Sequence, residues 1–147
     1  GLINAAVRDA NRDPRDGDHG FLPVFSIGNL GPSPLTVTWP GSAKNALTVG
    51  DHLKARINDL ATRHPLIGTV HGSGLYMGVE LVRDRETLEP APDETAAVCE
   101  RMRELGVIVQ PTGDRKNVLK MKPPMCITRE SADFFVDMLD RVLSTGW

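Results

Sequence analysis

Lys120 and Lys122 are the two side chains whose type and spacing give this 147-residue chain its clearest capacity to bind a ligand. They belong to the run VLKMK at 118–122, where apolar and basic residues alternate as expected for a β-strand. Successive side chains of a strand point to opposite faces, so both ammonium groups share one face and Leu119 and Met121 share the other. Two positive charges on one face favour an anion as the ligand. The alternative is a pair of solvated lysines on an edge strand.

A glycine pair, Gly72 and Gly74, lies in the stretch HGSGLYMG at 71–78 and has the G-x-G spacing of nucleotide-binding loops. In a dinucleotide fingerprint such glycines follow a strand and open into a helix, whose first turn binds the pyrophosphate. Here they open into the alternating segment 75–82, which predicts a strand. We therefore predict a hairpin or bulge, where a positive φ or a close backbone approach is needed.

The histidines and cysteines lack the spacing of a metal site. No two histidines stand at the interval of a helical zinc motif, and none is close to a cysteine in the sequence. These residues are His19, His52, His64, His71, Cys99 and Cys126. We expect no metal site, two reduced thiols, and turn hydrogen bonds from His64 and His71. Contact between His71 and a ligand is the alternative.

Charge and hydropathy exclude two classes of partner. The 17 basic and 19 acidic residues give a net charge of −2, and the basic residues are scattered, so we expect no nucleic acid partner. No apolar run approaches the roughly 20 residues that cross a bilayer, and the first residues lack the pattern of a signal peptide. We therefore expect no membrane partner and a cytoplasmic location.

The periodicity of apolar residues predicts the elements that must position these side chains. Helical spacing favours helices at 44–63 and 93–105 and a last helix after Thr128, a suitable N-cap residue. Extended segments are predicted at 67–71, 75–82, 107–110 and 118–122, with a charged connector at 84–92. This order predicts an α+β fold with two layers, in which helices cover one face of a small, mostly antiparallel sheet. The apolar stripe of the last helix, including Phe135 and Leu139, is expected to pack on the sheet.

The first part of the chain differs from the rest. Residues 1–42 are rich in polar residues, glycine and proline, and they predict a loop-rich segment with short strands near 21–27 and 35–38. Residues 43–147 are predicted to form one domain large enough to bury a core.

Four motifs in this second part carry a family resemblance. They are ALTVGDHLKARI at 46–57, HPLIGTVHGSG at 64–74, MGVELV at 77–82 and VLKMKPPMCIT at 118–128. In this order they resemble the C-terminal small domain of class III, fold type I, pyridoxal-phosphate-dependent aminotransferases. The resemblance covers 43–147 and is nearest to the alanine–glyoxylate aminotransferase and phospholyase-like branches. It implies the fold of an aminotransferase small domain.

The resemblance also implies a function. The chain would be a fragment of an enzyme that transfers an amino group between an amino donor and a 2-oxo acid, and it would supply a wall of the substrate entrance. Its partners would be the large domain that binds pyridoxal phosphate and a second copy in a homodimer. Lys120 stands where the family often presents an arginine that grips the substrate carboxylate. Lysine there is similar to phospholyase-like relatives, which act on phosphorylated amines.

Catalytic residues are not assigned in this chain. The resemblance implies that the lysine forming the internal aldimine and the aspartate facing the pyridine nitrogen belong to the large domain. None of the chain's lysines stands in a segment resembling the aldimine site; these are Lys44, Lys54, Lys116, Lys120 and Lys122. We therefore expect the chain alone to be inactive and to hold no cofactor, with Lys120 as a substrate-binding residue. The alternatives are a pyridoxal-phosphate-dependent phospholyase-like relative and a non-catalytic α+β binding or interaction module.

Overall fold

The computed structural model describes residues 42–147, in which a helix is followed by three strands, a second helix, two strands and a last helix. The helices are α2 (Ser42–Arg63), α3 (Pro92–Glu104) and α4 (Arg129–Thr145). The strands are β1 (Ile67–Ser73), β2 (Tyr76–Asp84), β3 (Glu89–Pro90), β4 (Gln110–Thr112) and β5 (Val118–Met121). The strands predicted near 21–27 and 35–38 lie outside the described residues. No helix in the described part is long and apolar enough to span a bilayer.

The sheet is antiparallel and has the strand order β1-β2-β5-β4, with the short β3 paired to β2. Its core face is set by the alternation that predicted the strands. The side chains on this face are between 0% and 3% exposed on the two central strands; they are Met77, Val79, Leu81, Leu119 and Met121. The predicted α+β fold with a mostly antiparallel sheet is confirmed.

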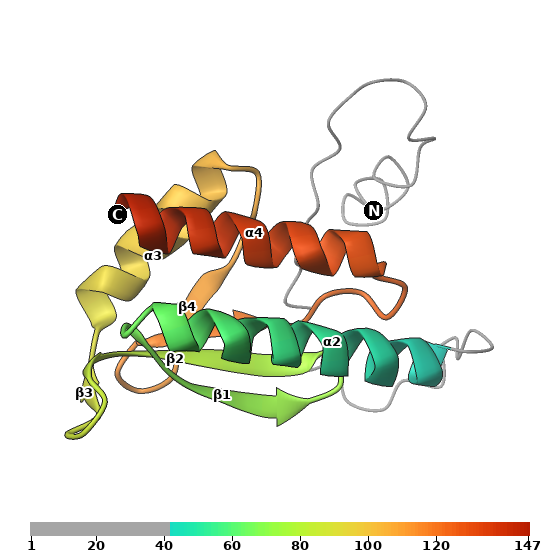
Figure 1. Cartoon of the computed structure of the whole chain (residues 1–147), viewed down its shortest axis with the longest axis horizontal. Coiled ribbons are helices and arrows are strands. Elements are labelled where there is room, and N and C mark those ends of the chain that lie inside the picture. Colours follow the sequence, from blue (N-terminus) through green and yellow to red (C-terminus); the bar gives the residue numbers. More distant parts are fainter. Residues whose placement is uncertain (1–41) are drawn as a thin grey trace, which may run out of the picture.

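The helices form the second layer. Figure 1 shows α2 and α4 side by side and running in the same direction, with α3 near the C-terminal end of α4. Leu53, Ile57 and Leu60 of α2 are at most 2% exposed and belong to the same hydrophobic core as the sheet. Phe135 and Leu139 of α4 belong to this core as well, so one core joins both layers.

Local signals in the sequence fix several element ends. The hydroxyl oxygen of Thr128 accepts a hydrogen bond from the backbone N–H of Ser131 at 3.2 Å, which confirms the predicted N-cap of α4. At the end of α2, the guanidinium of Arg85 donates to backbone carbonyls that the helix leaves without intrahelical partners. The acceptor near the end of the helix is the carbonyl of Ala61, and those in the turn that follows are the carbonyls of His64, Pro65 and Ile67.

The glycine pair forms the hairpin that joins β1 to β2, as predicted. Gly72 has φ 103° and Gly74 has φ 56°, and residues that carry a side chain rarely adopt such positive φ values. Helix α2 packs closely on this turn, because a Cβ added to Gly50 would lie 2.2 Å from the carbonyl oxygen of Gly74. The G-x-G spacing therefore serves a tight turn against a helix.

The strand predicted at 107–110 is wrong in position. The backbone N–H of Val107 donates to the carbonyl of Met102 at 2.9 Å, so this residue closes the end of α3. Val109 is buried beside it, and β4 begins only at Gln110. The predicted connector 84–92 also contains an unpredicted element, β3, whose Pro90 lies opposite Val82 of β2.

Candidate functional site

The open face of the sheet, opposite the helical layer, carries the residues that alternate with the core. The strand register aligns four of them in one row across the sheet. His71 of β1 lies opposite Gly78 of β2, Gly78 lies opposite Lys120 of β5, and Lys120 lies opposite Gln110 of β4. Because directly opposed residues share a face, this row places an imidazole and an ammonium group on the two sides of a glycine.

The two predicted lysines both lie on this open face and are half-buried, whereas Leu119 and Met121 are buried on the other face. Their surroundings differ. The ammonium group of Lys122 lies 4.4 Å from the centre of the Tyr76 ring, a distance typical of a cation–π contact. Within residues 42–147 the ammonium group of Lys120 has no hydrogen-bond or ion-pair partner. Lys120 is therefore the better placed of the two to bind a ligand.

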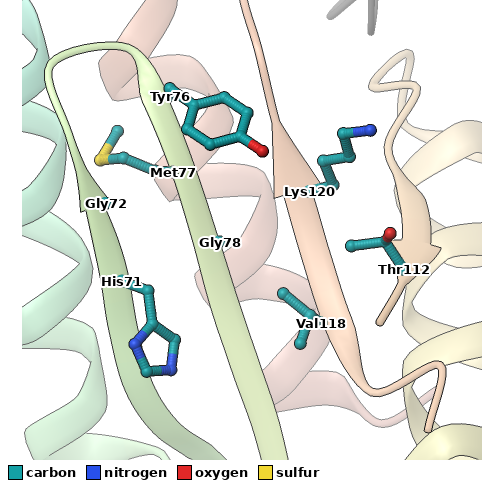
Figure 2. A pocket seen from close by; sticks show the side chains of 8 residues that line it. All are labelled: His71, Gly72, Tyr76, Met77, Gly78, Thr112, Val118 and Lys120. Atoms are coloured by element: carbon teal, nitrogen blue, oxygen red, sulfur yellow. The ribbon is translucent and has the colours of Figure 1, made fainter. Parts of the chain in front are cut away.

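A hollow of about 310 Å³ opens beside Lys120. It is lined by His71, Gly72, Tyr76, Met77, Gly78, Thr112, Val118 and Lys120. Figure 2 shows Gly78 between the strand that carries His71 and the strand that carries Lys120, with Thr112 on the side of Lys120. A Cβ added to Gly78 would lie 2.8 Å from Cγ1 of Val118, so the hollow needs a glycine at this point.

A short chain of polar side chains borders the hollow. Nε2 of His71 lies 3.1 Å from Oε2 of Glu80, and the Asn117 amide donates to Oε1 of Glu80 at 3.4 Å. Asn117 is itself buried and fixed, because its amide also donates to the carbonyl of Leu81 at 2.9 Å. The histidine predicted to make a turn hydrogen bond thus has its side chain on the carboxylate of the neighbouring strand.

His64 lies elsewhere, at the contact between α2 and α4. Its Nε2 is 2.6 Å from Oδ1 of Asp140, and a second pair joins His52 to Asp133 at 2.7 Å. In each pair the hydrogen bond from the histidine is the main cause that lowers the pKa of the aspartate below its usual range. These pairs tie two helices together and do not face the hollow. Sequence periodicity could not find them, because the partners are far apart along the chain.

The cysteines are in different environments. Cys99 is buried in α3, and its burial raises the pKa of the thiol to about 11. Cys126 is exposed in the loop before α4. In the part of the chain that the structure describes, no three His, Cys, Asp or Glu side chains are grouped so that they could hold a metal ion.

Fold and site together thus define a two-layer α+β domain whose open sheet face carries a lysine. The model of the family described as aminotransferase class-III matches residues 36–143. The chain belongs to the class III aminotransferase family.

Three known proteins illustrate this relationship. The chain is 43% identical over 101 residues to alanine–glyoxylate aminotransferase 2 homolog 2 of Arabidopsis thaliana, covering 69% of this chain and 21% of that protein. A phospholyase from Arthrobacter in complex with phosphoethanolamine superposes with a TM-score of 0.69 at 32% identity, covering 74% of this chain and 26% of that one. An amine transaminase from an uncultivated Pseudomonas species, in the PLP-bound internal aldimine form, superposes with a TM-score of 0.66 at 29% identity, covering 72% and 24%. The chain therefore spans about a fifth of the length of this curated relative.

The family uses pyridoxal phosphate, which raises the question of whether the described residues fit this cofactor. The cofactor requires a lysine for the internal aldimine and groups that tune its ring nitrogen. The hollow offers one lysine, Lys120, and the bordering carboxylate of Glu80 is already engaged by His71 and Asn117. The residues 42–147 do not by themselves combine into such a site.

Proposed function

We propose that this chain is part of a pyridoxal-phosphate-dependent class III enzyme that transfers an amino group between an amino donor and a 2-oxo acid. Membership of the family and the short span relative to its curated members support this proposal. The remaining parts of the site would come from a large domain that binds the cofactor and from a second copy in a homodimer. In this arrangement the open sheet face forms one wall of the substrate entrance.

The position of Lys120 is the observation that carries the proposal. Its half-buried side chain reaches the hollow from a central strand, and its ammonium group has no partner within the described residues. A lysine in this state attracts the carboxylate of an amino acid or a 2-oxo acid by charge. It does so as a point charge, because it lacks the planar fork with which an arginine binds both carboxylate oxygens.

The same lysine favours a second candidate, a phospholyase that acts on a phosphorylated amine. Resemblance places an arginine at this position in many class III aminotransferases, and the loss of its bidentate geometry weakens the selection of a planar carboxylate. A phosphate group carries more charge and is bound by a point charge without such geometry. The likeness to the Arthrobacter phospholyase supports this candidate.

A product analysis of the full-length enzyme, loaded with pyridoxal phosphate, separates the two candidates. It is incubated either with an amino acid and a 2-oxo acid or with a phosphorylated amine alone. Exchange of the amino group without phosphate release supports the aminotransferase. Release of inorganic phosphate from the phosphorylated amine without an acceptor supports the phospholyase. If neither reaction occurs, both candidates are rejected in favour of a non-catalytic module.

A further inference from the structure

We propose that His71 is a second anion-binding residue of the hollow, and that it acts together with Lys120 on a phosphate monoester group resting over Gly78. The inference rests on the second candidate under the proposed function, the phospholyase, because it assigns the phosphate group of the substrate to the hollow that Lys120 lines. It adds a specificity-determining residue on another strand and selects phosphate as the ligand chemistry.

The strand register provides the geometry. His71, Gly78 and Lys120 are consecutive partners across β1, β2 and β5, so His71 and Lys120 are two strand spacings apart, about 10 Å between their Cα atoms. Their side chains are long enough to approach one ligand from both sides of Gly78. Figure 2 shows the two side chains on either side of the strand that carries Gly78. A group held between them would contact an ammonium on one side and an imidazole on the other.

Gly78 makes the space for this ligand. It is the residue between the two basic side chains, and it presents only backbone to the hollow. A side chain there would occupy the gap, since even a Cβ would lie 2.8 Å from Cγ1 of Val118. The backbone of Gly78 therefore forms the floor of the hollow, which a ligand group can reach. The methyl group of an alanine at this position would take up part of that space.

Glu80 and Asn117 orient the imidazole. Asn117 is buried and holds Oε1 of Glu80, while Oε2 of Glu80 faces Nε2 of His71. In the protonated ring both nitrogens carry hydrogens, so Nε2 donates to Glu80 and Nδ1 is left to donate to the ligand. His71 is in this respect a binding residue, and Glu80 is a positioning residue.

The charges around His71 favour a dianion. Glu80 faces it from β2 and offsets one positive charge, whereas Lys120 faces it across Gly78 from β5. From α2, the ammonium group of Lys54 donates to the carbonyl of Gly72, next to His71, at 2.9 Å. The remaining positive charge on both sides of the floor suits a tetrahedral phosphate, whose several oxygens can contact His71 and Lys120 at once. A small carboxylate has two oxygens in one plane and spans this gap less well.

Nuclear magnetic resonance titrations of the 147-residue chain test the inference directly. Sodium phosphate and, separately, sodium acetate are added at constant pH and ionic strength, and the His71 ring and the Gly78 amide are followed. We expect saturable shifts of both resonances with phosphate and weaker binding of acetate. His71→Gln should weaken phosphate binding about three- to fivefold, the size expected for one partly exposed charged contact. His71→Lys should restore it, and Gly78→Ala should weaken it without any change of charge.

Each other outcome is decisive. Phosphate binding to His71→Gln with wild-type affinity overturns the inference, and so does the absence of a saturable Gly78 shift in the wild-type chain. A loss of binding in Lys120→Met alone, with His71→Gln unaffected, overturns the role of His71 and leaves the proposed function standing. If His71→Gln weakens phosphate binding while Lys120→Met does not, the two residues do not bind the same phosphate and the inference is overturned. The anion-binding role of Lys120 in the proposed function is then rejected as well. Because the His71 side chain is 58% exposed, its replacement leaves the core intact.

Discussion

Replacing Leu139 by alanine should strongly destabilise the domain, because this side chain of α4 is fully buried in the hydrophobic core. Leu139 is 0% exposed, and its neighbours in the stripe, Phe135 and Val142, are at most 4% exposed. Truncation removes the transfer free energy of the buried carbon atoms and leaves a cavity. Ion pairs to α2 hold the helix in place and hinder collapse of this cavity. We expect a loss of about 3 kcal/mol, within the range of about 2–5 kcal/mol for buried leucines.

The matched control is Asp137→Ala on the outer side of the same helix. Asp137 pairs with Arg56 at 2.8 Å, but their side chains are 61% and 38% exposed, so the loss should stay below about 1 kcal/mol. Urea or guanidinium titration of both variants, followed by circular dichroism, measures the two free energies of unfolding. Equal losses in the two variants would refute the assignment of Leu139 to the core.

Three further predictions concern pH, thiols and the cofactor. The hydrogen bond from His64 lowers the native pKa of Asp140, so the stability that this carboxylate contributes is complete above the ordinary pKa of aspartate and is lost as the pH falls through the lowered pKa. Asp140→Asn should therefore flatten the dependence of the free energy of unfolding on pH below about pH 5. An unchanged pH profile would contradict this prediction. Cys126 should react with a thiol reagent in the folded chain, whereas Cys99 should react only after unfolding, and equal rates would contradict its burial. Borohydride reduction of the chain mixed with pyridoxal phosphate should give no stoichiometric labelling of a single lysine; such labelling with turnover of an amino donor would place catalytic machinery in this chain.

Local patterns in the sequence were sufficient for much of the fold. The alternation in β2 and β5 assigned Lys120 to the open face, and the helical stripe of α4 assigned Leu139 to the core. Both signals depend only on the periods of strands and helices. The start of β4 was harder to predict, because Val107 begins an apolar run and yet its backbone N–H bonds back to the carbonyl of Met102 in α3. Its apolar character did not reveal that backbone role.

Features built from distant segments required the structure. His64 and Asp140 are 76 residues apart, and no sequence pattern joins them. The hollow depends on the register that aligns His71, Gly78 and Lys120, and that register is set by the packing of three strands. The substrate role of Lys120 remains a prediction.

Substrate kinetics of two lysine variants test the central proposal most directly. In the full-length enzyme, Lys120→Met should raise the KM for the anionic substrate and reduce its dependence on salt, because the attracting charge is removed. Lys120→Arg should favour carboxylate substrates through its planar fork. Lys122→Met is the control, since the ammonium group of Lys122 lies over Tyr76, and it should leave the KM nearly unchanged. An unchanged KM in Lys120→Met together with an altered KM in Lys122→Met would contradict the assignment of the anion-binding role to Lys120.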